Sequence, residues 1–265
     1  MLCRARADLD AIYNYLNSDA EPTNDIDIFF NNAGGIRTDW CWSGTAWVSS
    51  GCVEGTHEPA LLNYGHMFTI LPFGNATIVG KMTGAQILEV INFAPNVAGM
   101  IQPAGLKYKY FKYKDTKPGP QPYAWGAFDA CVTNKVTKAC DPLDLKKTYK
   151  VGTNEFLAPA GQDGYVPFKY MKNITYWGDM LNGVNRWVAA NYTAASPYAG
   201  VPDGRITRVG TDAGGGNTDV MYTLRVKDGA TELIQVPRGA WGGTQNWWMR
   251  LIQEPDACHE FSFQG

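Results

Sequence analysis

The chain has little net charge and no long apolar stretch, which argues against two classes of protein. Its formal net charge is -2 and its pI is near 5.9, which argues against a nucleic-acid binder that works through a basic surface. No run of about 18 or more apolar residues occurs, so no membrane-spanning helix is expected. The opening residues, "MLCRAR", lack the apolar segment of a secretory signal peptide.

Residues that bind metal ions are also scarce. The chain has three histidines, His57, His66 and His259, and no two of them have the spacing of a shared metal site. None of the six cysteines belongs to a Cys-x-x-Cys pair, which argues against a zinc site. The simplest interpretation is a structural role for His66 and a loop position for His57.

The cysteines have spacings typical of short loops closed by a disulfide bond. One pair flanks "WSGTAWVSSG" and the other flanks "VTNKVTKA". Such bonds favour an extracytoplasmic protein, because thiols in the cytosol are kept reduced. The pairs are Cys41 with Cys52 and Cys131 with Cys140, and Cys3 and Cys258 are left over, either free, paired together or bonded outside the chain.

Aromatic residues and glycine, by contrast, are abundant. The chain of 265 residues contains 9 Trp, 14 Tyr, 11 Phe and 29 Gly, and 45% of its residues are hydrophobic. A hydrophobic content of this size builds a real core, either in one large domain or in a domain with an extension. The aromatic and glycine content favours a loop-rich fold that contains β-strands.

Periodic apolar patterns predict helices at residues 8–17, 83–94 and 177–192. In the second helix, Thr83 and Gln86 have the spacing of a capping box. Alternating patterns predict strands at 25–30, 66–71, 76–80, 106–114 and 148–157. Within 106–114 the alternation of aromatic residues and lysines changes phase at Phe111, which predicts a β-bulge there.

The composition changes after Arg208. The sequence "VGTDAGGGNTD" is typical of a flexible linker, and the stretch that follows alternates like short strands. Its Trp-rich segment "WGGTQNWW" fits a core and also a carbohydrate-binding face, and the core is favoured. The predicted divisions are a domain at 1–207, a linker at 208–218 and a short β-rich extension at 219–265.

The stretch "DIDIFFNNAGGIRTD", residues 25–39, has two interpretations. Read to Asn-Asn-Ala-Gly, it is similar to the NNAG turn of short-chain dehydrogenases. Binding of a nicotinamide dinucleotide needs a glycine-rich turn upstream of this element, yet residues 1–30 contain no glycine. The Tyr-x-x-x-Lys spacings, such as Tyr108 with Lys112, lie in a strand-like pattern rather than on a helix. The dehydrogenase interpretation is therefore rejected.

Read from Asn32, the same stretch matches an N-x-G-G-I-R element, and two further motifs follow it in order. Residues 71–75, "LPFGN", precede a strand and a T-G-x-x-I helix, and residues 154–165, "NEFLAPAGQDGY", end in a glycine-rich loop. Together these motifs resemble the C-terminal, substrate-binding domain of the 5'-nucleotidase/UDP-sugar hydrolase family over about residues 1–207. The resemblance implies an α+β fold, a layered domain with a mixed β-sheet and flanking helices.

The residue types in these motifs suit the binding of a phosphorylated ligand. Glycines without a Cβ allow a ligand to approach the backbone, and a planar guanidinium suits phosphate oxygens. The resemblance implies that Phe73 and Phe156 stack on the base, Asn32 and Arg37 contact the phosphate side, and Asp163 binds the ribose. The complete set of predicted substrate-binding residues is Arg4, Asn32, Gly34, Gly35, Arg37, Phe73, Gly74, Asn75, Asn154, Phe156 and Asp163.

Two departures from the family pattern weaken individual assignments. Cys3 and Arg4 match the start of a C-R-x-x-E-C element, but the rest of that element is missing. The last loop carries one additional residue before Asp163, and Gln162 replaces a glycine, so the loop is expected to place Asp163 differently.

The resemblance also implies what the chain lacks. Hydrolysis in the family uses a divalent metal pair in an N-terminal calcineurin-like metallophosphatase domain with D-x-H and G-N-H-E motifs, and neither motif occurs here. We therefore expect no catalytic residue and no cofactor in this chain, which would bind a nucleotide or nucleoside for an exported hydrolase. The full-length protein would be secreted, periplasmic or on the cell surface. The alternative is a stand-alone, non-catalytic nucleotide- or nucleoside-binding module.

Overall fold

The computed structural model contains two compact units. It describes residues 2–18, 25–38, 41–42, 47–48, 63–96, 100–114, 123–192, 204–208, 220–227, 230–237, 249–251 and 259–263. The first unit consists of Met1–Met82, Gly99–Gly105 and Thr148–Asp203, and the second of Thr83–Ala98, Leu106–Lys147 and Gly204–Gly265.

The first unit is built on a five-stranded mixed sheet with the strand order β10-β4-β9-β1-β5. Strand β1 runs parallel to β9 and antiparallel to β5, and β10 runs antiparallel to β4. The strands are β1 (Ile28–Asn31), β4 (Ala76–Thr83), β5 (Gln102–Ala104), β9 (Thr148–Asn154) and β10 (Lys172–Asp179). A two-stranded pair, β2 (Cys41–Trp42) with β3 (Trp47–Val48), also belongs to this unit.

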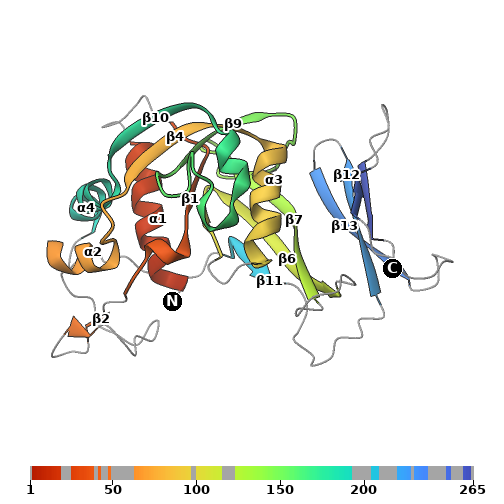
Figure 1. The fold of residues 1–265 in the computed structure, drawn as a ribbon, viewed down its shortest axis with the longest axis horizontal. Helices are drawn as coiled ribbons and strands as arrows, with labels where there is room; N and C mark the ends of the chain where they lie inside the picture. The colour runs from red at the N-terminus through yellow and green to blue at the C-terminus, as the bar shows by residue number, and fades with distance from the viewer. Residues whose placement is uncertain are drawn as a thin grey trace. The chain divides into compact units, whose positions relative to one another are not determined.

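Three helices complete the first unit, and α1 and α4 lie side by side (Figure 1). They are α1 (Leu2–Leu16), α2 (Tyr64–Ile70) and α4 (Met180–Asn191). Gly183 allows the close approach, because a Cβ there would lie only 2.7 Å from the Cδ1 atom of Ile12. The core beneath the helices includes Leu9, Ile12, Leu16, Phe29, Met67, Ile70, Val79 and Leu181.

The second unit contains a sheet with the strand order β11-β6-β7-β8, in which β11 joins β6 in parallel. These strands are β6 (Leu106–Lys114), β7 (Tyr123–Thr133), β8 (Cys140–Pro142) and β11 (Ile206–Arg208). Helix α3 (Gly84–Phe93) begins close to another segment of the same unit, because a Cβ at Gly84 would collide with the carbonyl oxygen of Asp144. The Oδ1 atom of Asn92 accepts a hydrogen bond of 2.9 Å from the backbone N–H of Ala127 and links α3 to β7.

Four more strands near the C-terminus form an antiparallel sheet with the order β13-β12-β15-β14. They are β12 (Val220–Lys227), β13 (Ala230–Pro237), β14 (Met249–Leu251) and β15 (His259–Phe263). The predicted division of the chain into a domain, a linker at 208–218 and an extension stays a prediction.

The fold class is the one expected from the sequence, and the predicted helices occur with changed bounds. Thr83 and Gln86 form the predicted capping box of α3, in which each side chain bonds to the other residue's backbone N–H. The third helix begins at residue 180 rather than 177, because residues 172–179 pair with β4. Asp179 ends that strand and caps α4, since its Oδ1 atom accepts a hydrogen bond from the N–H of Asn182 at 2.9 Å.

Residues 66–71 were expected to form a strand, and this prediction is wrong. They lie mainly in helix α2, whose N-terminus is capped by Asn63. His66 completes the capping box, because its Nδ1 atom accepts a hydrogen bond from the N–H of Asn63 and its own N–H donates to the Asn63 Oδ1 atom. Met67 and Ile70, one turn apart, are buried. The short apolar run "HMFTIL" is thus one face of a helix rather than an alternating strand.

The strand predicted at 106–114 is present as β6, but its bulge lies in the partner strand. Residues Tyr110 to Lys114 pair with β7 in an unbroken register, so Phe111 is not a bulge. The register shifts between Lys107 and Lys109, which pair with Cys131 and Phe128 and leave an additional residue in β7. Asp129 in this part of β7 has a left-handed φ of 51°.

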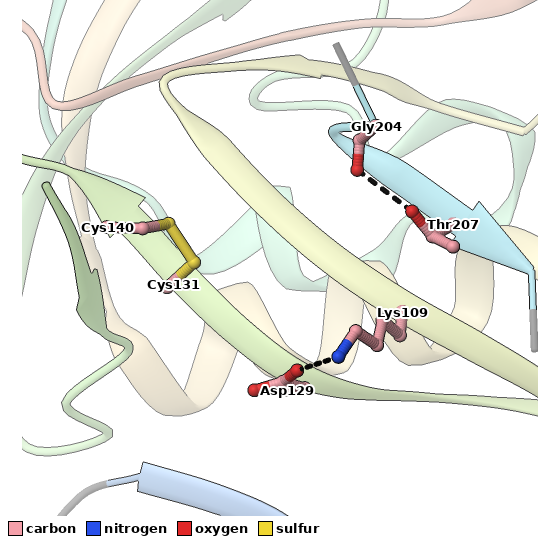
Figure 2. The surroundings of a disulfide bond; sticks show 6 residues. All are labelled: Lys109, Asp129, Cys131, Cys140, Gly204 and Thr207. Carbon is pink, nitrogen blue, oxygen red and sulfur yellow. Dashed lines mark hydrogen bonds and ion pairs between the residues drawn. A yellow bond between two sulfur atoms is a disulfide. The ribbon is translucent and has the colours of Figure 1, made fainter. Parts of the chain in front are cut away.

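The predicted disulfide between Cys131 and Cys140 is confirmed. It joins β7 to β8, with the two Cα atoms 5.3 Å apart (Figure 2). The other predicted pair, Cys41 with Cys52, lies outside the residues whose side chains the structure describes.

Candidate functional site

The loops that carry the three sequence motifs meet at one edge of the first unit's sheet. Strands β1 and β9 are parallel neighbours, so the loops that follow them begin at the same edge. Glu155, directly after β9, donates its backbone N–H to the carbonyl oxygen of Ala76 at 2.9 Å, and its Oε1 atom accepts from the Ala76 N–H at 3.1 Å. The turn that precedes β4, including Phe73, therefore lies at this edge as well.

A buried cluster of three side-chain amides joins the ends of β1 and β9. We call Asn31, Asn32 and Asn154 the amide cluster, and their relative exposures are 2%, 4% and 0%. The Nδ2 group of Asn154 donates to the Oδ1 atoms of Asn31 at 2.7 Å and Asn32 at 2.9 Å, and its Oδ1 atom accepts from the N–H of Leu157 at 3.0 Å. Because a buried amide is costly unless it is hydrogen-bonded, these bonds fix the two loops relative to each other.

Asp163 lies on the exposed loop after β9 and is linked to the amide cluster. Its Oδ2 atom accepts a hydrogen bond from Asn32 Nδ2 at 3.5 Å. The residue has a left-handed φ of 56°, a conformation that Asp and Asn tolerate better than most residues, and Gly161 and Gly164 nearby also have positive φ.

Tyr165 anchors the same loop to the interior of the unit. Its hydroxyl oxygen accepts a hydrogen bond from the backbone N–H of Ile101 at 2.8 Å, and its ring contacts Phe168 edge to face. Burial raises the pKa of Tyr165 above its ordinary value, so this hydroxyl is neutral at physiological pH. The tyrosine of the "QDGY" motif therefore has a clear structural role.

Arg37 and Phe73 lie together on the exposed side of this edge. The Cζ atom of Arg37 is 5.6 Å from the centroid of the Phe73 ring, and its Nη1 atom donates to the carbonyl oxygen of Gly34 at 3.1 Å. The backbone N–H of Arg37 donates to the carbonyl oxygen of Ile70 at 2.9 Å, which ties the loop after β1 to the end of α2. A guanidinium has five N–H donors, so this arrangement leaves Arg37 able to bind an anion.

Two phenylalanine rings near this edge are unusually exposed. Phe73 is 57% exposed and Phe156 is 38% exposed, whereas Phe29 and Phe30 of β1 are fully buried. Among the described residues neither exposed ring stacks on another aromatic ring. Such rings present faces on which a planar ligand can stack.

The glycines of the first motif differ in their surroundings. A Cβ on Gly35 would lie 3.1 Å from the Oδ1 atom of Asn32, which is a tight contact with the amide cluster. A Cβ on Gly34 would lie 3.6 Å from the Nδ2 atom, an ordinary contact. Gly74 has a left-handed φ of 60°, which the turn before β4 requires.

The structure thus brings ten of the eleven predicted substrate-binding residues to one edge, nine of them in loops and Asn154 at the end of β9, and Arg4 is the exception. Arg4 belongs to α1, and its side chain lies outside the described set. The predicted set lacks Asn31 and Glu155, whose side chains help to hold the loops together. The repeated asparagine at the end of β1 was a signal for Asn31, whereas nothing local identified Glu155.

A separate cavity in the first unit has a volume of about 200 Å³ and is lined by residues of α1, α4, β4 and β10. Its polar lining includes Tyr15, Asp179 and Arg186, and its apolar lining includes Ile12 and Trp177. None of the predicted substrate-binding residues lines this cavity. The candidate site is therefore the group of exposed loops at the sheet edge.

Within the described ranges, no three His, Cys, Asp or Glu side chains gather closely enough to hold a metal ion. His66 is engaged in the capping box of α2. No helix among the residues that the structure describes is both long and apolar enough to cross a membrane.

Comparisons with known proteins identify relatives of this chain. Cell wall protein Lmo0130 of Listeria monocytogenes is 32% identical over 153 residues, which are 57% of this chain and 17% of that protein. NAD 5'-nucleotidase of Haemophilus influenzae is 27% identical over 171 residues, which are 62% of this chain and 23% of that protein. The chain therefore spans less than a quarter of either relative.

A solved structure supports the fold. The 5'-nucleotidase precursor from Thermus thermophilus aligns with a TM-score of 0.55 and 21% identity, covering 78% of this chain and 35% of that one. The family model of the 5'-nucleotidase C-terminal domain matches residues 4–170, a range that includes the amide cluster and all three motif loops. Because this match covers more than half of the chain, the protein belongs to the 5'-nucleotidase family and carries its C-terminal domain.

Proposed function

We propose that this chain is the nucleotide-specificity part of a 5'-nucleotidase-type phosphohydrolase, which converts a nucleoside monophosphate to a nucleoside and phosphate. One observation carries the proposal: two exposed phenylalanines, an arginine and an aspartate, from loops far apart in sequence, lie at one sheet edge. These groups match the three chemical parts of a nucleotide. Family membership supports the same conclusion.

Each group has a role in the proposed site. Phe73 and Phe156 stack on the base, and each stacking contact contributes about 1–3 kcal/mol. The Asp163 carboxylate accepts hydrogen bonds from ribose hydroxyls. Arg37 binds the phosphate, and its position over Phe73 leaves one face of that ring covered by the guanidinium. A base that stacks on Phe73 therefore uses the other face or displaces Arg37.

Catalysis in the proposed enzyme needs residues from outside this chain. The described residues offer no set of metal ligands, so they do not fit the divalent metal pair that the family resemblance implies. We infer that the metals belong to an N-terminal metallophosphatase domain of a longer protein, since the chain covers only 35% of the Thermus structure. The chain by itself binds a nucleotide and hydrolyses none.

We also propose an extracytoplasmic location for the full-length protein. The Cys131–Cys140 disulfide supports it, because such bonds persist in oxidising compartments. The relative Lmo0130 is named a cell wall protein.

Isothermal calorimetry tests the base-binding part of this proposal. Adenosine, AMP and UMP are titrated into the wild-type chain, the Phe73→Ala/Phe156→Ala variant and Phe68→Ala, a matched control at another exposed phenylalanine, which stacks on Tyr64. We expect the double variant to lose about tenfold or more in adenosine affinity and the control to lose none. An unchanged adenosine affinity in the double variant contradicts the stacking roles.

Arg37→Ala separates the phosphate contact from the base contacts. We expect this variant to lose most of the advantage of AMP over adenosine, because adenosine has no phosphate for Arg37 to bind. An assay of AMP hydrolysis with added manganese completes the test. Turnover at an enzyme-like rate by the chain alone contradicts the inference that the catalytic metals lie elsewhere.

A further inference from the structure

Both side-chain N–H donors and the side-chain carbonyl oxygen of Asn154 have hydrogen-bond partners within the protein. A side-chain amide has two N–H donors, and both donors of Asn154 are used, one by Asn31 and one by Asn32. Its carbonyl oxygen accepts from the backbone N–H of Leu157. The side chain is also fully buried, so it offers no surface to a solute. Asn154 therefore acts on the site only through other residues.

Asn32 is the residue through which Asn154 reaches the exposed loop. The Asn32 oxygen must face Asn154, because the Nδ2 group of Asn154 is a donor. The amide is planar, so this orientation directs the Asn32 Nδ2 group toward the Asp163 carboxylate, 3.5 Å away. A reversed Asn32 amide would place two donors against each other and an oxygen against the carboxylate.

Asp163 depends on this contact for its position. The residue is exposed, and Gly161 and Gly164 on either side of it in the loop both have positive φ. Among the described residues, Asn32 is the hydrogen-bond partner of its carboxylate. The donor and acceptor are 131 residues apart in sequence, so the bond joins two separate loops.

We propose that Asn154 is a buried positioning residue that sets the Asp163 carboxylate through the Asn32 amide and so controls the preference of the site for ribose hydroxyls. This inference rests on the proposed nucleotide-binding function. Asn32 then has a positioning role rather than the direct phosphate-side contact predicted from the resemblance. Asn154 likewise supports the site rather than contacting the substrate.

Asn31 provides a matched control. It is as buried as Asn32, and it accepts a hydrogen bond from the same Nδ2 group of Asn154. No side-chain bond among the described residues leads from Asn31 to Asp163. Asn31→Ala therefore disturbs the same cluster without breaking the link to the carboxylate.

The test compares adenosine with 2',3'-dideoxyadenosine, which lacks both ribose hydroxyls, by calorimetry on the full chain. For the wild type we expect adenosine to bind roughly tenfold or more tightly, because hydrogen bonds to a carboxylate are strong. Asp163→Asn keeps the left-handed backbone and lowers this ratio several-fold. Asn154→Asp removes the Nδ2 donor and so reverses the Asn32 amide, and we expect it to lower the ratio of the two affinities to the same extent. Asn31→Ala retains the wild-type ratio.

The double variant Asn154→Asp/Asp163→Asn makes the test quantitative. If Asn154 acts through Asp163, the double variant shows no further loss of the ratio beyond either single variant. The inference is overturned if Asn154→Asp weakens both ligands equally and keeps the wild-type ratio, since that is the result of a purely structural defect. It is also overturned if the losses of the two single variants multiply in the double variant.

Side-chain amide NMR tests the link without any ligand. We expect the Nδ2 protons of Asn32 and Asn154 to exchange much more slowly than those of Asn182, which is exposed, and Asp163→Asn to shift the Asn32 signals. Rapid exchange at Asn32, or Asn32 signals that do not change in Asp163→Asn, would contradict the hydrogen bond between Asn32 and Asp163. This holds even if Asn154→Asp fails to fold. If the wild type binds neither nucleoside, the proposed function fails, and the NMR result still decides whether the link exists.

Discussion

Two regions of the molecule hold their loops in place by opposite means. At the sheet edge of the first unit, the loops after β1 and β9 are joined by the amide cluster, which is buried and non-covalent. In the β7–β8 hairpin of the second unit, Cys131 and Cys140 form a covalent bond, and Lys109 on the adjacent strand forms an exposed ion pair with Asp129 (Figure 2). The amide cluster and the disulfide differ in which part of the loop geometry each of them fixes.

A disulfide limits the separation of two strands, whereas an amide also fixes the direction of each donor and acceptor. Asn154 dictates which end of Asn32 faces the loop after β9, and no cross-link through sulfur sets such an orientation. Directional bonds suit a region that must present a carboxylate, a guanidinium and two rings in defined positions. The hairpin shows no comparable set of exposed groups in its described residues.

We expect the greatest loss of stability when the amide cluster is broken. Asn154→Ala leaves two side-chain acceptors and the N–H of Leu157 without their partner in a buried place, and we expect the free energy of unfolding to fall by about 3 kcal/mol or more. Asn134→Ala in the hairpin is the matched control. Asn134 also makes three side-chain hydrogen bonds, but they are exposed, and we expect a loss of about 1 kcal/mol or less.

Urea denaturation of both variants measures this difference. Equal losses at the two asparagines would contradict the claim that burial, rather than the number of bonds, distinguishes the two regions.

The next largest loss of stability is expected when the Cys131–Cys140 disulfide is removed. Replacing both cysteines, Cys131→Ser with Cys140→Ser, releases a short loop, and we expect the free energy of unfolding to fall by about 2–3 kcal/mol. Nucleoside affinity should not change, because the hairpin contributes no residue to the proposed site. Urea denaturation measures the stability, and calorimetry measures the adenosine affinity. A loss of adenosine affinity in a folded variant would contradict the claim that the hairpin plays no part in nucleoside binding.

A third effect is confined to alkaline pH and concerns Tyr13 of α1, whose hydroxyl donates a hydrogen bond to the carbonyl oxygen of Asp27, just before β1. Burial, followed by the negative charges of Asp27, Asp25 and Asp10, raises the pKa of Tyr13 from 10.0 to about 12. The folded state therefore holds the Tyr13 proton more tightly than the unfolded state, and stability falls as pH rises from about 10 to about 12. Tyr13→Phe should flatten this fall, as measured by urea melts between pH 9 and pH 12; an unchanged slope would show that Tyr13 titrates normally.

The smallest effect is expected at the exposed ion pair of the hairpin region. The Nζ atom of Lys109 lies 2.5 Å from the Oδ2 atom of Asp129, but the two side chains are 47% and 54% exposed. Solvent and salt screen such a pair, so Lys109→Ala should change the free energy of unfolding by about 0.5 kcal/mol or less. A loss comparable to that of the disulfide would mean that the ion pair, despite its exposure, is a main support of the bulge at Asp129.

Features set by neighbours in sequence were predictable, and features set by distant partners were not. The capping box of α3 needs only Thr83 and Gln86, and the sequence predicted it correctly. The amide cluster depends on partners more than 120 residues apart, so no local pattern could identify Asn154 as a positioning residue. The bulge assigned to Phe111 lies in β7 because register depends on both strands.

Short apolar runs were the other source of error. Residues 66–71 fit a strand and one face of a short helix equally well, and the cap at Asn63 decides between them. The exposure of Phe73 could be anticipated from its small and rigid neighbours, Pro72 and Gly74. The position of Arg37 over that ring could not, because it depends on how the loop after β1 bonds to the end of α2.

Titration of the isotope-labelled chain with AMP, followed by backbone amide NMR, tests whether a nucleotide binds at the sheet edge of the first unit. We expect the largest shifts at residues 32–37, 73–76 and 155–164, which surround the amide cluster, and no shifts in the β7–β8 hairpin. Shifts centred on the hairpin, shifts spread evenly over the chain, or no shifts at millimolar AMP would contradict a nucleotide site at this sheet edge.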